Sequence, residues 1–166
     1  MHPEAYEGFG EMLYAAEVDR DAPLTVLDLG GQNVNGSVHT WFTHPDTRIT
    51  TLDLENADII ADATAWDPDG QYDIVIATEV FEHVEEWPLI LVTARRALGS
   101  GGVFVGTCAS TDRPPHGATG APEPIYGEWY RNVTPAELQD ALDELFAHAE
   151  VTYRHPPGDA YMWARR

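Results

Sequence analysis

Two carboxylates and an imidazole stand close together near the middle of the chain. Glu79, Glu82 and His83 are spaced so that they would share one face of a helical turn, as positions i, i+3 and i+4 do. Such a group suits a divalent cation such as Mg²⁺ or Mn²⁺. His83 also suits a general base, because an unperturbed imidazole titrates near neutrality. The residues favour neither role over the other, and we predict Glu79 and His83 as catalytic residues in both cases.

A long segment without helix or strand pattern, residues 110–132, follows later in the chain. Loops of this length in compact domains are usually functional, so we expect it to cover the acceptor side of a site. We predict His116 as a further catalytic residue and a further metal ligand. The residues predicted to contact an acceptor, through their rings or a positive charge, are Tyr126, Tyr130 and Arg131. Trp129 is expected to pin the loop to the domain instead.

Alternating strand and helix patterns surround these residues. The segments predicted as strands are 25–29, 48–53, 59–61, 73–77 and 103–107, and those predicted as helices are 1–20, 87–98 and 134–146. Gly99 is expected to cap the second helix at its C-terminus. This alternation predicts a parallel sheet with helices on both faces. Strands at 151–154 and 161–164 would add an antiparallel hairpin at the C-terminus.

Acidic residues and glycines stand where successive strands end. In parallel sheets, ligands bind at the carboxyl ends of the strands. Gly30 and Gly31 would let the backbone approach a ligand closely. Asp53 can accept hydrogen bonds from both hydroxyls of a ribose, and Asp62 can accept one from an adenine amino group. Each acid alone also fits turn chemistry, but their occurrence at successive strand ends favours a nucleotide site.

These segments together resemble a known family. The strings Asp28-Leu29-Gly30-Gly31, Ala61-Asp62-Ala63 and Thr78-Glu79-Val80-Phe81-Glu82-His83, with Asp53 between them, resemble the class I S-adenosylmethionine-dependent methyltransferases of the type 11 group. The resemblance implies a Rossmann-like α/β fold with a seven-stranded, mostly parallel sheet, in which only the last strand is antiparallel. It also implies a single methyltransferase domain over residues 1–166.

The resemblance assigns roles to individual residues. The implied cofactor-binding residues are Asp28, Gly30, Gly31, Asp53, Leu54, Asp62, Ala63 and Thr78. Leu54 would flank the adenine, and Thr78 and Glu79 would lie near the reactive sulfonium. The family often has glycines where this chain has Gln32 and Val34, and Asn33 and Asn35 can adopt part of the same left-handed geometry.

The Glu-x-x-Glu-His string is similar to that of ubiquinone-pathway O-methyltransferases and of small-RNA 2′-O-methyltransferases. In those families the string implies a metal ion, here at Glu79, Glu82 and His83, that grips neighbouring oxygens of the acceptor, and His116 from the long loop is our candidate for a further ligand. We therefore expect O-methylation of a small or carbohydrate-like hydroxyl acceptor, with or without Mg²⁺ or Mn²⁺. The alternatives are a non-catalytic S-adenosylmethionine-binding module and, less favoured because a complete Gly-x-Gly-x-x-Gly is missing, a nicotinamide-dependent oxidoreductase.

Composition limits the partners. The chain has 28 acidic and 9 basic residues, a formal net charge of −19 and no lysine, which disfavours binding to duplex nucleic acid. Neither a signal peptide nor a membrane span is predicted, and we expect a cytoplasmic protein. A homodimer is one way to complete the pocket of so small a domain. The histidines without ligand spacing are His2, His39, His44, His148 and His155, and buried Cys108 is expected to be structural.

Overall fold

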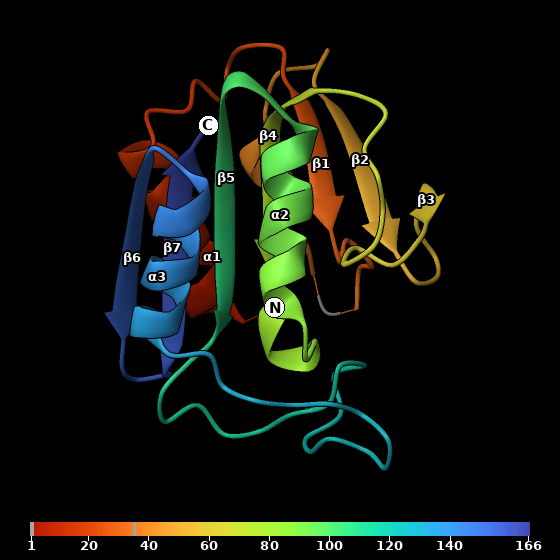
Figure 1. Cartoon of the computed structure of the whole chain (residues 1–166), viewed down its shortest axis with the longest axis vertical. Coiled ribbons are helices and arrows are strands. Elements are labelled where there is room, and N and C mark those ends of the chain that lie inside the picture. Colours follow the sequence, from red (N-terminus) through yellow and green to blue (C-terminus); the bar gives the residue numbers. More distant parts are fainter. Residues whose placement is uncertain (1, 35) are drawn as a thin grey trace.

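A single mixed sheet forms the centre of the computed structural model, which describes residues 2–34 and 36–166 (Figure 1). Its strands are β1 (Thr25–Leu29), β2 (Arg48–Asp53), β3 (Ile59–Ile60), β4 (Tyr72–Thr78), β5 (Leu98–Ala109), β6 (His148–Arg154) and β7 (Asp159–Arg165). They lie in the order β3-β2-β1-β4-β5-β7-β6. Only β7 runs antiparallel to its neighbours β5 and β6. The predicted Rossmann-like sheet with a C-terminal hairpin is confirmed.

Helices cover both faces of this sheet. The helices are α1 (Pro3–Ala15), α2 (Trp87–Ala97) and α3 (Pro135–Leu145), and the short 3₁₀ turns are η1 (Val38–Trp41) and η2 (Phe81–His83). In Figure 1, α2 and α3 lie in front of the sheet and α1 lies behind it. Adjacent residues of β5 serve the two layers, since Phe104 packs into the α2–α3 core and Val105 into the α1 core. This is the alternation that a strand imposes on its side chains.

The helix α3 begins as its sequence predicts. The Thr134 hydroxyl accepts a hydrogen bond from the Glu137 N–H, and the Glu137 carboxylate accepts one from the Thr134 N–H. This reciprocal pair is a capping box, and it satisfies donors that a helix N-terminus otherwise leaves unpaired. It also fixes where the preceding loop must end.

The predicted end of α2 is wrong. The helix stops at Ala97, and Leu98 is already extended and begins β5. Leu98 pairs with Tyr72 of β4 and is part of the sheet. Gly99 therefore lies within β5 and does not cap the helix. Left-handed glycine geometry is used instead at Gly101, whose φ is 75°. Strand β5 is consequently longer than predicted.

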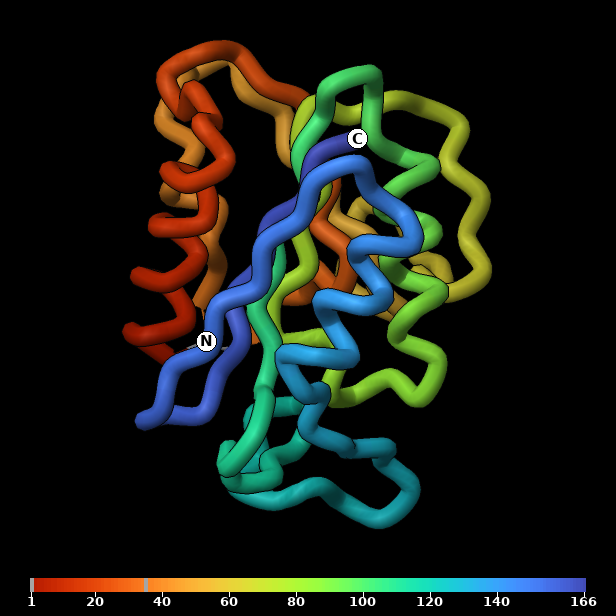
Figure 2. Tube along the Cα trace, turned by 60° about the vertical axis from the view of Figure 1, so that its left-hand side comes forward, coloured from red at the N-terminus to blue at the C-terminus, as the bar shows by residue number. Residues whose placement is uncertain are grey.

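The carboxyl ends of the parallel strands share one edge of the sheet. The loop between β5 and α3 crosses this edge, as the teal segment at the bottom of Figures 1 and 2 shows. The loop therefore lies where ligands bind in sheets of this kind. Among the described residues, none of the helices is long and apolar enough to cross a membrane.

Candidate active site

A cavity of about 1070 Å³ opens at the carboxyl edge of the sheet. All of the residues predicted to bind cofactor line it, namely Asp28, Gly30, Gly31, Asp53, Leu54, Asp62, Ala63 and Thr78. Glu79, His83 and His116 line it as well. The structure thus brings together residues from successive strand ends, as parallel strand order requires.

Gly30 is fixed by packing as well as by backbone conformation. Its φ is 76°, which disfavours a side chain, and a Cβ atom there would lie 2.4 Å from Val80 Cγ2. The N–H groups of Gly30 and Gly31 both donate to the Leu52 carbonyl, at 2.8 and 3.1 Å. The turn after β1 is therefore locked against both β2 and the segment after β4. Asn35, predicted to contribute to this loop, lies outside the described residues.

Asp53 ties two strand ends together. Its Oδ2 accepts a hydrogen bond from the Gln32 N–H at 3.0 Å, and its Oδ1 accepts one from the Leu54 N–H at 2.7 Å. Each carboxylate oxygen has a further lone pair available. Leu54 beside it is 70% exposed, so an apolar surface stands free at the cavity edge.

Asp62 shows the turn chemistry that its sequence position also allowed. Its Oδ1 accepts hydrogen bonds from the Thr64 N–H and hydroxyl, at 2.8 and 2.7 Å. Its Oδ2 has no hydrogen bond to any described residue, and Asp62 lines the cavity. The turn holds one oxygen and leaves the other for a ligand.

Asp28 carries a buried oxygen without a partner. His39 Nε2 lies 2.7 Å from Asp28 Oδ2, whereas Oδ1 is buried and has no hydrogen bond to a described group. Burial raises the pKa of Asp28, and His39 offsets this only in part. An unpartnered acceptor on a cavity wall suits a donor of the ligand. The spacing of His39 in the sequence predicts no such role for it.

The shared helical face predicted for Glu79, Glu82 and His83 is wrong. Glu79 precedes η2 and has a left-handed backbone with φ 58°. Its N–H donates to the Thr107 carbonyl at 2.8 Å, which continues the pairing of β4 with β5. Its Oε1 accepts from the Thr107 hydroxyl at 2.9 Å. The sheet therefore turns Glu79 away from the other two residues.

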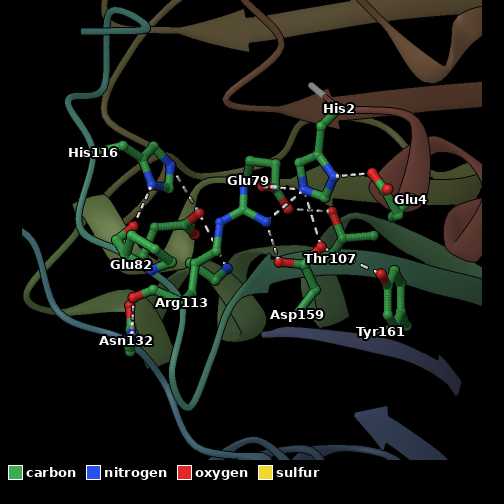
Figure 3. Close-up of polar contacts among 12 residues, drawn as sticks. His2, Glu4, Glu79, Glu82, Thr107, Arg113, His116, Asn132, Asp159 and Tyr161 are labelled. Carbon is green, nitrogen blue, oxygen red and sulfur yellow. Dashed lines mark hydrogen bonds and ion pairs between the residues drawn. The ribbon is translucent and has the colours of Figure 1, made fainter. Parts of the chain in front are cut away.

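Glu79 belongs instead to a network with His2, which sequence analysis had also set aside (Figure 3). His2 Nε2 lies 3.0 Å from Asp159 Oδ2 and 3.7 Å from Glu79 Oε2. Its Nδ1 lies 3.0 Å from Glu4, and Arg113 Nη1 lies 2.8 Å from Asp159 Oδ1. Arg113 Nη1 is also 2.9 Å from His2 Nε2, a contact between two cations that the shared Asp159 carboxylate compensates. Partners so distant in sequence leave no local pattern to detect.

The network separates the charges of two neighbouring glutamates. The carboxylates of Asp159, at 3.0 Å, and Glu79, at 3.7 Å, raise the pKa of His2 to about 10, which favours its imidazolium form. Burial alone would raise the pKa of Glu79. The contact with His2 and its positive charge outweigh the effect of burial, so the pKa of Glu79 is lowered. Burial first, and the charge of Glu79 second, raise the pKa of Glu82. Glu79 is thus held as an anion, while Glu82 favours a proton or another cation.

Glu82, His83 and His116 form a second cluster. Their candidate ligand atoms all lie within 4.8 Å of one another. Glu82 Oε1 accepts from the Ala109 N–H at 3.1 Å and lies 3.8 Å from His116 Nε2. Glu82 Oε2 and His83 Nδ1 are buried without a hydrogen-bond partner among the described groups. The structure therefore joins three of the four predicted metal ligands and excludes Glu79.

His83 is a weaker base than its residue type suggests. Burial, followed by the charge of His116, lowers the pKa of His83 to about 4. A base this weak has little tendency to take a proton near neutrality. A neutral imidazole is, however, the form that binds a metal ion.

The loop residues are arranged differently from the prediction. Tyr126 is fully exposed and does not line the cavity, and Arg131 pairs with Glu137 at 2.8 Å at the start of α3. Tyr130 packs on His83 and His116, with ring centroids 5.4 and 5.1 Å away. Trp129, expected to pin the loop, lines the cavity and is 40% exposed. Glu137, which caps α3, also binds Arg131 and holds it at the start of that helix. The composition of the loop does not predict this ion pair.

A family model described as a methyltransferase domain matches residues 9–145. The chain belongs to this methyltransferase family. The assignment agrees with the methyltransferase class that the resemblance implied, and it argues against the oxidoreductase alternative. No match was found among curated protein sequences.

Solved structures of methyltransferases share the fold. The 1,6-didemethyltoxoflavin N1-methyltransferase of Burkholderia thailandensis, with bound 1,6-didemethyltoxoflavin and S-adenosylhomocysteine, is 19% identical with a TM-score of 0.68 over 98% of this chain and 78% of that one. The plantazolicin methyltransferase BpumL in complex with S-adenosylhomocysteine is 12% identical with a TM-score of 0.70 over 99% and 85%. A putative O-methyltransferase of Nostoc punctiforme is 17% identical with a TM-score of 0.60 over 99% and 61%.

Proposed function

We propose that this methyltransferase uses S-adenosylmethionine to methylate a hydroxyl group of a small-molecule or carbohydrate-like acceptor. The observation that carries the proposal is the single cavity lined by Gly30, Asp53, Asp62 and Glu79 in strand order. The S-adenosylhomocysteine found in structurally similar methyltransferases supports the choice of cofactor. The net charge of −19 argues against a duplex nucleic acid as acceptor.

The cavity offers complementary groups for each part of this cofactor. Asp53 would accept hydrogen bonds from the ribose hydroxyls, and Asp62 Oδ2, which has no hydrogen bond to a described residue, would accept one from the adenine amino group. The unpartnered Oδ1 of Asp28 suits the ammonium of the amino-acid part. Leu54 and Ala63 supply apolar surface for the adenine ring.

The chemistry requires alignment and a proton acceptor. S-adenosylmethionine supplies a methyl group on a sulfonium, and its transfer to a hydroxyl oxygen breaks the C–S bond and forms a C–O bond. The hydroxyl proton must leave. We assign its removal to Glu79, which lines the cavity, whose lowered pKa favours the anion, and whose Oε2 has only the 3.7 Å ion pair with His2 among the described residues. With its lowered pKa, Glu79 is as weak a base as His83, whose pKa is about 4, so the assignment rests on the negative charge of Glu79 and its place at the cavity and not on its basicity.

The cluster of Glu82, His83 and His116 suits a divalent cation. Two of its buried polar atoms lack partners, and a cation would satisfy both. One carboxylate with two imidazoles fits Mn²⁺ or a similar transition ion better than Mg²⁺, which prefers oxygen ligands. Such an ion would act as a Lewis acid that lowers the pKa of the acceptor hydroxyl. Loss of Glu79 from the predicted ligand set is the reason for favouring Mn²⁺.

Calorimetric titration tests the cofactor first. We expect S-adenosylmethionine and S-adenosylhomocysteine to bind the full chain, and Asp53→Ala to weaken both. Failure of the wild-type protein to bind either compound would overturn the proposal.

An acceptor screen with a methyl-labelled cofactor, using hydroxyl, amine and thiol compounds, then tests the hydroxyl assignment, and transfer to amines alone would contradict it. Sedimentation of the apo protein and of its cofactor complex tests whether a homodimer completes the pocket.

A further inference from the structure

Tyr130 stands against the outer side of the Glu82–His83–His116 cluster. Its hydroxyl lies 3.3 Å from His116 Nδ1 and 3.5 Å from the Pro114 carbonyl, and His116 Nδ1 itself lies 3.4 Å from that carbonyl. The three groups form a closed polar triangle behind the His116 ring. Neither Tyr130 nor Pro114 lies between His116 and Glu82, because the other ring nitrogen of His116, Nε2, faces Glu82 Oε1 at 3.8 Å.

This triangle favours one tautomer of His116. The Pro114 carbonyl can only accept a hydrogen bond, so a proton on Nδ1 satisfies both neighbours. His116 Nδ1–H then donates to the Tyr130 oxygen, while the Tyr130 hydroxyl donates to Pro114. With the proton on Nδ1, the lone pair is on Nε2, toward Glu82 and His83. Metal-binding histidines are oriented in the same way, by a hydrogen bond from their other nitrogen.

Two further contacts hold Tyr130 at this place. Its ring packs against that of His83, with centroids 5.4 Å apart, so one side chain touches both imidazoles. The N–H of the following residue, Arg131, donates to the Glu82 carbonyl at 2.8 Å. Tyr130 is thereby fastened to all three members of the cluster, directly or through its neighbour.

We infer that Tyr130 is a positioning residue of a divalent-cation site made by Glu82, His83 and His116, and that its hydroxyl presents His116 Nε2 to the cation. This rests on the cation site proposed above. Tyr130 was predicted from the sequence to contact the acceptor, and the geometry gives it a different task. The Pro114 carbonyl is needed for this role, since without it the Tyr130 hydroxyl would donate to His116 Nδ1 and favour the other tautomer.

Cation binding to the full chain tests the inference without any acceptor. The variant Tyr130→Phe keeps the ring and removes only the hydroxyl, and Tyr126→Phe is its matched control on the same loop, where the side chain is fully exposed. We expect Tyr130→Phe to weaken Mn²⁺ and Co²⁺ binding about 10-fold, as loss of a supporting hydrogen bond typically does, and to alter the visible spectrum of bound Co²⁺. Tyr126→Phe should match the wild type. Equal affinity and equal spectra in both variants would overturn the inference.

Nitrogen NMR of the cation-free wild-type protein gives a second measurement that needs no variant. At mildly alkaline pH we expect His116 as the neutral Nδ1-protonated tautomer, with a mixture of tautomers in Tyr130→Phe. A predominantly Nε2-protonated His116 in the wild type would contradict the inference. If the wild type binds no Mn²⁺, Co²⁺ or Zn²⁺, the cation site itself is refuted, and the tautomer still shows whether Tyr130 orients His116.

Discussion

His2 Nε2 lies 3.0 Å from Oδ2 of Asp159, so the residue before α1 meets the first residue of β7 at the cavity. Asp159 is completely buried, and its other partners among the described side chains are Arg113 and Tyr161. A buried carboxylate that loses one of its donors is destabilised. The pair therefore contributes to the stability of the fold and to the charge state of Glu79.

The stability lost on replacement of His2 should depend on pH. The pKa of His2 is raised from 6.5, its ordinary value in an unfolded chain, to about 10 in the folded protein. Protonated His2 therefore stabilises the folded state fully at pH values below 6.5, and this stabilisation is lost as the pH rises through 10. We expect His2→Gln to lower the free energy of unfolding by about 1–3 kcal/mol at pH values below 6.5. The deficit should shrink as the pH approaches 10. Thermal melts across this range, with exposed His155→Gln as the control, measure it; a deficit that is constant with pH would count against the ion pair.

Asp53→Ala should weaken cofactor binding. The carboxylate is the proposed acceptor for the ribose hydroxyls, and loss of hydrogen bonds to a charged group costs about 1.5–3 kcal/mol, or roughly 10- to 100-fold in affinity. The control is Asp69→Ala, at an exposed residue away from the cavity. Asp53 also accepts from the Gln32 and Leu54 N–H groups, so melting temperatures must accompany the titrations. Unchanged affinity in a folded variant would refute the ribose assignment.

Gly30→Ala should be more harmful than Gly36→Ala. Both glycines have positive φ, 76° and 104°, but a Cβ atom at Gly30 meets Val80 at 2.4 Å whereas one at Gly36 meets nothing within 4 Å. Backbone strain alone costs about 1–2 kcal/mol, and the clash adds to it only at Gly30. Denaturant unfolding of both variants measures the difference. Val80→Ala should restore part of the loss in Gly30→Ala, and equal losses in the two single variants would show that the close approach is relieved without cost.

The sequence predicts the sheet and the strand-end acids because both depend on local patterns. Alternation of short apolar strands with amphipathic helices fixes a parallel order, and this order alone brings Asp53 and Asp62 to one edge. The arrangement of Glu79, Glu82 and His83 depends on finer geometry. Glu79 leaves the expected helical face because its N–H continues the β4–β5 pairing, and no spacing rule contains that information. His2 and His39 enter the site through contacts with residues of distant elements, which a single sequence does not display.

The charge of Glu82 should lower the stability of the fold when no cation is bound and raise it when a cation is bound. Burial raises the pKa of Glu82, so its ionised form destabilises the empty site as pH rises above the ordinary carboxyl range. Glu82→Gln keeps the shape without the charge, and we expect it to melt at or above the wild-type temperature when no cation is present.

Addition of Mn²⁺ should reverse this order. A cation that binds the folded state alone stabilises it by about 2.7 kcal/mol at a hundredfold excess over its dissociation constant. Wild type should gain this amount and Glu82→Gln should not, because the anionic ligand is missing. Exposed Glu123→Gln, from the same loop as His116, is the control for nonspecific binding to an acidic protein. Should Mn²⁺ raise the melting temperatures of all three proteins equally, the cation is bound elsewhere, and Glu82, His83 and His116 form only a wall of the acceptor pocket.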